Sequence, residues 1–209
     1  MLSVDQISAR LNDRFRLLTG GSRTGVARQR TLEATVDWSY DLLSKTERRL
    51  LCRLSVFAGG WTLEAAEHVC SGIGGRKETM LDLLSHLVDK SLVIADDDGG
   101  GGRRYRLLET VRQYGRERVV RSGDAERVRD RHLVFFADLV RRAEPELQKA
   151  DQVAWLNRLQ LEHDNLRAAL DWCLTAPERA DLGLELTAAL FWFWTKRGYL
   201  GEGLSLIHI

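Results

Sequence analysis

The chain has 209 residues, of which 44% are hydrophobic and 29% are charged, a balance that is typical of a globular protein with a packed core. This composition excludes a disordered chain, a collagen and a disulfide-rich miniature protein. Thirty-one Lys and Arg residues against 30 Asp and Glu residues leave a formal charge of +1, which cannot by itself hold the molecule on nucleic acid or on an anionic membrane.

The N-terminal sequence, the lack of a long apolar run and the cysteines together predict a cytoplasmic protein. The N-terminal sequence lacks a basic segment followed by an apolar one, and no run approaches the roughly 20 apolar residues of a membrane-spanning helix. Three well-separated cysteines, Cys52, Cys70 and Cys173, resemble small buried hydrophobes rather than a disulfide or zinc framework.

The first elements are helical. Residues 1–30 contain an amphipathic helix that ends at Gly20-Gly21 and is followed by an arginine-rich loop. A second helix is predicted from Thr31 to Leu43. Ser44 and Glu47 then form a capping-box pattern at the start of a helix that closes at Gly59-Gly60.

The next segment predicts a winged helix. Thr62 caps a short helix, and Glu78–Lys90 forms another with a leucine face. Residues 92–95 and 104–107 read as two strands around a glycine-rich tip. Three helices followed by a β-hairpin is the order of a winged helix-turn-helix. A further helix is predicted over 108–122.

The remaining chain predicts helices over about 125–147, 152–174 and 182–196, with no strand. Gly198–Gly203 is typical of the turn in a tetratricopeptide unit, and Phe191–Trp194 is better explained as interhelical core than as a ligand surface.

The predicted fold is therefore mainly α, a winged helix-turn-helix with a small β-hairpin followed by a tetratricopeptide-like helical repeat region. Each half is expected to have its own core. The uncapped apolar run Leu204–Ile209 leaves open whether the native sequence continues through it.

A series of distinctive segments runs along nearly the whole chain: RFRLLTGG at 14–21, DWSYDLLS at 37–44, LSVFAGG at 54–60, LVDKSL at 87–92, YRLLETVRQY at 105–114 and LEHDNLRAA at 161–169. In this order, the segments resemble the region after the nucleotide-binding core in bacterial STAND regulators, signal-transducing NTPases related to the NB-ARC switch. The resemblance implies three parts: the end of the ATPase lid at 1–30, the winged helix at 31–123, and the start of the helical-repeat sensor at 124–209.

The resemblance also implies that ATP or ADP binds elsewhere in the parent protein. No phosphate-binding loop occurs in this chain, and Gly20–Gly25 lacks the required lysine, so no cofactor is expected here. The Met-His-Asp signature of related winged helices has its counterpart at Leu107-Leu108-Glu109. Only the acidic residue is kept, which makes Glu109 the candidate for sensing nucleotide.

DNA contact is the alternative for the winged helix. The exposed side of Glu78–Lys90 is acidic and lacks base-reading donors, which favours an intramolecular role. Residues 103–131, however, carry ten Arg and five acidic residues, so a phosphate or DNA contact stays open. The candidate residues for that contact are Arg103, Arg104, Arg106 and Arg112.

The sequence predicts no enzyme. The five histidines lack metal-ligand spacing, and no nucleophile has a recognisable base partner. The leading hypothesis is a non-catalytic regulatory fragment whose winged helix couples an absent nucleotide-binding domain to repeats that receive a protein or small-molecule signal. The alternatives are a winged-helix DNA-binding transcriptional regulator and part of an ATPase completed by an upstream domain.

Overall fold

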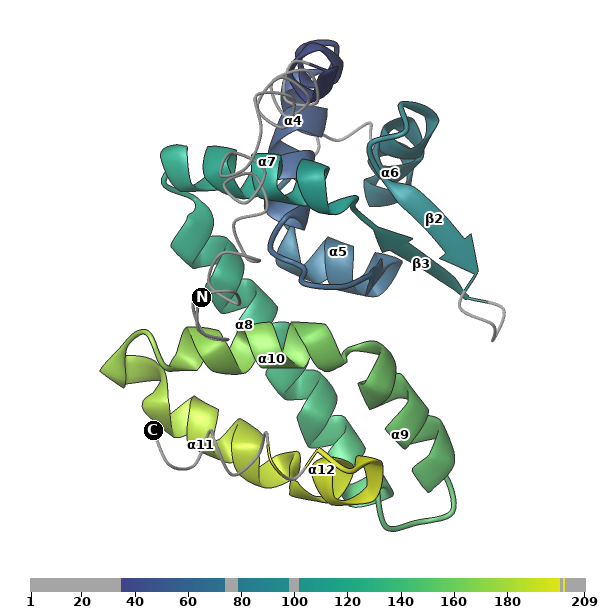
Figure 1. Cartoon of the computed structure of the whole chain (residues 1–209), viewed down its shortest axis with the longest axis vertical. Helices are drawn as coiled ribbons and strands as arrows, with labels where there is room; N and C mark the ends of the chain where they lie inside the picture. The colour runs from purple at the N-terminus through teal and green to yellow at the C-terminus, as the bar shows by residue number, and fades with distance from the viewer. Residues whose placement is uncertain (1–34, 74–78, 98–101, 200, 202–209) are drawn as a thin grey trace, which may run out of the picture. The chain divides into compact units, whose positions relative to one another are not determined.

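The computed structural model describes residues 35–73, 79–97, 102–199 and 201 (Figure 1). It divides the chain into two compact units, residues 1–44 and 45–209. In the first unit, residues 35–41 are helical, while the predicted lid segment 1–30 lies outside the described residues. The second unit is mainly helical with one small sheet, which confirms the predicted fold class.

The winged helix has the predicted order of helices and hairpin. Its elements are α4 (Lys45–Leu54), β1 (Trp61–Thr62), α5 (Leu63–Val69), α6 (Met80–Asp89), β2 (Ile94–Asp97), β3 (Arg103–Arg106) and α7 (Glu109–Arg121). Thr62 caps α5, because its hydroxyl accepts a hydrogen bond from the Ala65 amide at 3.2 Å. Thr79 and Asp82 form a reciprocal capping box at the start of α6.

The sheet has three strands in the order β1-β3-β2, all antiparallel, and β1 was not predicted. Its two residues are too few for an alternating pattern, and β1 exists only because Trp61 pairs with the distant Tyr105. Strand β2 also begins later than predicted, at Ile94 instead of Leu92, whereas β3 begins one residue earlier than predicted, at Arg103. Leu92 and Val93 are buried, and their amides both donate to the Leu87 carbonyl, so they close α6 instead of starting β2.

The helical region is built from more and shorter helices than predicted. Its elements are α8 (Ala125–Ala143), the 3-10 turn η1 (Glu144–Glu146), α9 (Gln152–Leu161), α10 (His163–Cys173), the 3-10 turn η2 (Pro177–Arg179), α11 (Ala180–Ala189) and α12 (Phe191–Arg197). The predictions of single helices over 152–174 and 182–196 were wrong, since the chain breaks at Glu162 and at Leu190. Neither break carries a glycine or proline, so the sequence gives no local signal for it.

Two glycines let helices approach closely. A Cβ on Gly115 in α7 would lie 2.9 Å from the Ser55 Cβ and 3.2 Å from the Leu51 carbonyl oxygen, so α7 lies directly against α4 and the residues that follow it. A Cβ on Gly183 in α11 would lie 2.9 Å from the Cys173 Cβ in α10. Both positions exclude a larger side chain unless the neighbouring helix shifts.

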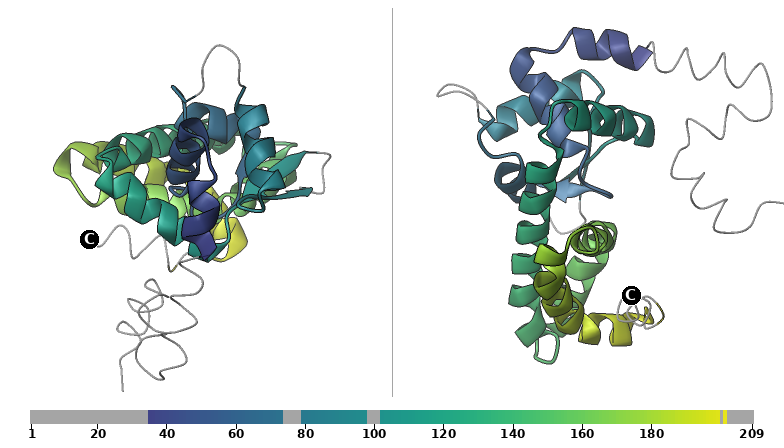
Figure 2. Two further views of the ribbon diagram at one scale, coloured as in Figure 1. Left: turned by 90° about the horizontal axis from the view of Figure 1, so that it is seen from above. Right: turned by 90° about the vertical axis from the view of Figure 1, so that its left-hand side faces the viewer.

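The winged helix and the helical region share a core. The Phe57 ring stacks on Trp61 with 5.2 Å between ring centroids and also contacts His132 and Phe136 of α8. Figures 1 and 2 show α8 as the long helix that runs from α7 past α5 to the last four helices. The expectation of two separate cores was therefore wrong, because α8 contributes side chains to both halves.

We predict that Gly115→Leu destabilises the protein by about 1–3 kcal/mol, because the added side chain must push α7 away from α4. The control is Val120→Leu, which places the same leucine side chain at an exposed position of the same helix. Its free energy of unfolding should change by less than about 0.5 kcal/mol. Urea denaturation measures both, and equal stability of the two variants would contradict the close α4–α7 contact.

Candidate nucleic-acid interface

Helix α6 is the element that a DNA-binding winged helix places in the major groove. Its buried face consists of Leu83, Leu84 and Leu87. The exposed residues of the helix and its C-cap are Leu81, Asp82, Ser85, His86, Asp89 and Lys90. This surface offers no Arg, Asn or Gln to base edges, and its two carboxylates repel phosphate.

Three polar side chains of α6 and its C-cap already have partners within the protein. The Lys90 ammonium lies 2.5 Å from a Glu47 carboxylate oxygen in α4, and His86 lies 3.7 Å from the same oxygen. The Asp82 carboxylate accepts hydrogen bonds from the amide and hydroxyl of Thr79, which lower the pKa of Asp82 and keep it charged. The positive charge on α6 is thus neutralised while a negative charge is held in place.

Two of the predicted contact residues, Arg106 and Arg112, pair with separate carboxylates. Arg106 pairs with Asp96 across the hairpin at 2.7 Å. Arg112 donates two hydrogen bonds, of 2.8 and 2.7 Å, to the carboxylate of Glu109, the nucleotide-sensing candidate. Arg103 is exposed, and its guanidinium has no ion pair with any described residue. The structure does not gather these side chains on one surface, and their roles stay predictions.

Arg104 points away from solvent into the helical region. Its guanidinium binds the Glu162 carboxylate and donates to the carbonyl oxygens of Gly60 at 3.0 Å and Leu161 at 3.2 Å. The Arg104 and Glu162 side chains are only 13% and 7% exposed, so this ion pair is largely screened from water and salt. The predicted phosphate contact is therefore occupied in this structure by an internal carboxylate.

Asn165 extends this contact into a buried polar network. Its side-chain oxygen accepts from the Ala58 amide at 3.0 Å, and its amide donates to the Gly60 carbonyl at 2.8 Å and to Glu162 at 2.9 Å. His132 of α8 lies 3.4 Å from the same Asn165 oxygen. We call Arg104, His132, Glu162 and Asn165 the Asn165 cluster; it joins β3, α8 and α10 to the loop before β1.

Sequence reasoning missed the Asn165 cluster. Near Asn165, only His163 was considered as a site residue, as one of the five histidines that lack metal-ligand spacing. The available signal was the position of Asn165, beside Leu166 and one turn from Ala169 on the buried face of α10. A polar side chain on an apolar face requires a buried partner, although the sequence does not identify which one.

Burial keeps the His132 imidazole neutral. The ring is fully enclosed between Phe57 and Phe136, and this desolvation lowers the pKa of His132 to about 4, despite the opposing hydrogen bond to Asn165. His132 thus acts as a neutral packing and hydrogen-bonding group at neutral pH.

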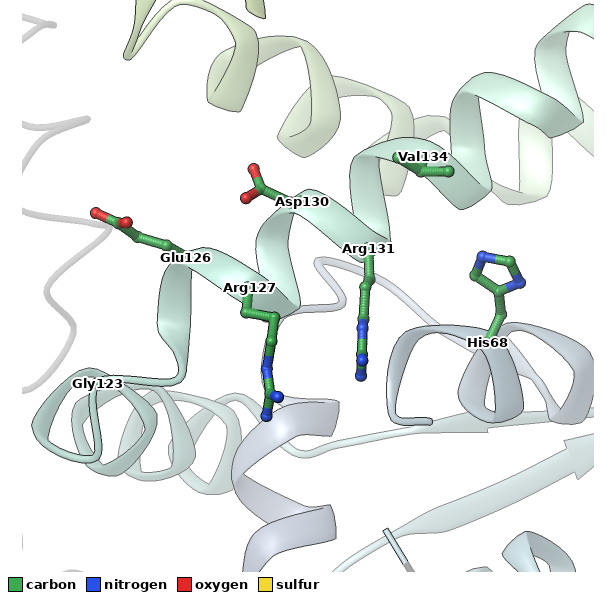
Figure 3. Close-up of a pocket in the computed structure, with 7 residues that line it drawn as sticks. All are labelled: His68, Gly123, Glu126, Arg127, Asp130, Arg131 and Val134. Carbon is green, nitrogen blue, oxygen red and sulfur yellow. The ribbon is translucent and has the colours of Figure 1, made fainter. Parts of the chain in front are cut away.

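A surface pocket of about 480 Å³ lies beside α8 (Figure 3). Arg127 and Arg131 point toward the α4–α5 side, whereas Glu126 and Asp130 point away from them. Arg127 pairs with Asp124, and Arg131 donates to the Ser71 carbonyl oxygen at 2.8 Å. The pocket is lined by His68, Gly123, Glu126, Arg127, Asp130, Arg131 and Val134. Its charged groups do not converge on a point where a reaction could occur.

Within the described residues, no three His, Cys, Asp or Glu side chains lie close enough to hold a metal ion. The described helices are also too short or too polar to cross a membrane.

Comparison with known proteins supports the winged helix directly. Residues 43–120 match the family of winged helix-turn-helix domains. A Mycobacterium tuberculosis protein and a Mycobacterium bovis protein are each 43% identical to this chain over 203 residues, and their names propose HTH-type transcriptional regulators. The alignment covers 96% of this chain but 22% of each relative, so the chain spans about a fifth of their length. An uncharacterised Mycobacterium tuberculosis protein is 43% identical over 136 residues, or 63% of this chain and 33% of its own length. No solved structure matches the chain significantly.

We predict that Asn165→Leu destabilises the protein by about 1–3 kcal/mol, because it leaves the Ala58 amide without its partner, while the Gly60 carbonyl keeps its hydrogen bond from Arg104. Arg167→Ala, an exposed change on the same helix, should stay within about 0.5 kcal/mol of the wild type. Thermal and urea unfolding measure the difference. A wild-type stability for Asn165→Leu would show that the network does not hold the two halves together.

We also predict that the protein loses stability in acid through His132. The folded-state pKa of about 4 lies below the ordinary value of 6.5, so the unfolded state binds a proton first. This contribution is complete above about pH 6.5 and is lost as the pH falls toward 4. The total is about 3 kcal/mol, at about 1.4 kcal/mol for each pH unit between the two values. His132→Gln should flatten the stability profile in this window; an unchanged slope would contradict a neutral, buried His132.

Proposed function

We propose that this chain is a regulatory segment of a helix-turn-helix transcriptional regulator, and that its winged helix acts on other parts of that regulator rather than reading DNA sequence. The observation that carries this proposal is that α6 has an acidic surface and that an arginine of β3 is already paired inside the protein. Helix α6 presents Asp82 and Asp89 where a groove-binding helix needs donors, and Arg104 of β3 is bound to Glu162.

Transcriptional regulation is supported by the names of the mycobacterial relatives and by the winged helix-turn-helix match. The winged helix as an internal coupling element is supported by the Asn165 cluster and by the aromatic contacts of Phe57 with α8. These contacts mean that a displacement of α8 or α10 must change the environment of the hairpin. The helical region is therefore suited to pass a bound signal to the winged helix.

A nucleotide-binding domain elsewhere in the parent protein is a further part of this proposal. It is supported by the resemblance of residues 105–114 and 161–169 to STAND regulators, whereas the family description and the relatives' names refer to neither an ATPase nor tetratricopeptide repeats. In this scheme ATP or ADP binds the parent protein, Glu109 faces the nucleotide site, and a protein or small molecule binds the helical region. A cytoplasmic setting follows from the same scheme.

Direct DNA contact is the second candidate function. It is favoured by the helix-turn-helix names of the relatives and by Arg103, an exposed guanidinium on the hairpin. Such a contact would use phosphates, because α6 lacks the side chains for base readout. It would therefore be weak and independent of sequence.

The test is a selection of bound duplexes from a random library with the 209-residue chain. We expect no defined motif, and any affinity should fall steeply between about 50 and 200 mM salt. Asp82→Asn combined with Asp89→Asn should raise this non-specific affinity, because two repelling charges are removed from α6. The control is Asp151→Asn combined with Asp181→Asn, an equal change of charge at exposed positions of the helical region. A defined motif that is lost on replacing Ser85 and His86 would establish base readout by α6 and overturn the proposal.

A further inference from the structure

The surface pocket beside α8 is lined by basic side chains from two helices. Arg127 and Arg131 lie one turn apart on α8 and project to the same side, and His68 lines the pocket from α5 (Figure 3). Val134 adds an exposed apolar side chain. With a volume of about 480 Å³, the pocket is large enough for a small organic ligand.

Hydrogen bonds and ion pairs join the two arginines of the pocket into one network. Arg127 pairs with Asp124, and the same carboxylate lies 2.6 Å from the guanidinium of the buried Arg53. Arg53 also donates to the Ser71 carbonyl oxygen at 2.8 Å, and Arg131 donates to that oxygen at 2.8 Å. Three guanidiniums thus share one carboxylate, and three positive charges less one negative charge leave the network with a net charge of +2.

The two acidic residues that line the pocket do not offset this charge. Asp130 points away from both arginines and accepts hydrogen bonds from Arg179 at 2.9 Å and from Trp172 at 2.8 Å. Glu126 is exposed to solvent and also points away from the arginines (Figure 3). These carboxylates therefore leave the basic side of the pocket open to an anion.

We propose that this pocket binds the phosphate group of a small molecule, with Arg131 as the main contact and Arg127 and His68 as further donors. The guanidinium of Arg131 has a fork of N–H donors, and the Ser71 carbonyl engages its Nη1 atom. Within the part of the chain that the structure describes, Arg131 has no carboxylate partner. The inference does not rest on the function proposed above, because it involves neither α6 nor the Asn165 cluster.

A phosphate monoester fits this site better than a carboxylate or a nucleic-acid backbone. A monoester carries close to two negative charges at neutral pH, which matches the net charge of the network. A carboxylate and a backbone phosphate each carry one. The monoester oxygens can also accept from two arginine forks at once. Val134 and the His68 ring supply contact area for the organic part of the ligand.

The test titrates the 209-residue chain with phenyl phosphate and, separately, with inorganic phosphate, benzoate and a short DNA duplex, using calorimetry at constant ionic strength. We expect phenyl phosphate to bind more tightly than inorganic phosphate, because its ring contacts Val134. It should also bind more tightly than benzoate, because it carries the larger charge. The imidazole proton signals of His68, identified with His68→Gln, should shift on binding.

Arg131→Gln should weaken the binding of phenyl phosphate about tenfold, as the loss of one charge-assisted contact does. This variant is expected to fold, because the Ser71 carbonyl keeps its hydrogen bond from Arg53. His68→Gln changes an exposed residue of α5 and gives a second, smaller loss of affinity.

The matched control is Arg129→Gln, which removes the same charge from the same helix. Arg129 does not line the pocket, and its guanidinium lies 4.9 Å from the centroid of the Trp172 ring. Binding of phenyl phosphate that is weakened by Arg131→Gln and kept in Arg129→Gln supports the proposal. The proposal is overturned if phenyl phosphate does not bind, if benzoate binds equally well, if the two variants weaken binding equally, or if the duplex alone binds.

Discussion

The arrangement of residues 45–209 depends on one buried side chain, Asn165. Its amide group satisfies the Ala58 N–H and the Gly60 carbonyl, two backbone groups in the loop that leads into β1. Backbone groups without partners are costly, so the loop depends on α10 for the hydrogen bond of the Ala58 amide, and on α10 and Arg104 together for the Gly60 carbonyl. Since β1 pairs with β3, the position of the whole hairpin follows from that contact.

The apolar contacts around Asn165 add stability, but they specify one arrangement of the helices less strictly than the polar contacts do. Phe57, Trp61 and Phe136 form a packed aromatic group that would tolerate other hydrophobic residues of similar volume. The Asn165 cluster is more selective, because each donor faces a particular acceptor. It therefore fixes which face of α10 meets the winged helix, while the aromatic rings supply apolar contacts between α8 and the winged helix.

The sequence predicted the features that are encoded locally. The order of helices and hairpin, the Thr62 cap and the helix end at Gly198 follow from spacing and from residues with strong backbone preferences. It could not predict features that depend on distant residues. Strand β1 needs Tyr105, the break at Glu162 coincides with its contact to Arg104, and the shared core needs α8 to lie beside Phe57. Of the candidate site, the acidic side of α6 was predicted, whereas the partner of Arg104 was not.

The break at Glu162 also decides how motion in α9 reaches the hairpin. Helix α9 has ten residues and is about 15 Å long. A tilt of about 10° about Glu162 would move its far end by roughly 2.6 Å but would leave the Leu161 and Glu162 oxygens, which hold Arg104, almost in place. Arg104 is thus held at the point about which α9 would tilt. A tilt of α9 would leave Arg104 almost in place, whereas a sliding movement of α10 along its own axis would shift the Glu162 carboxylate that binds it.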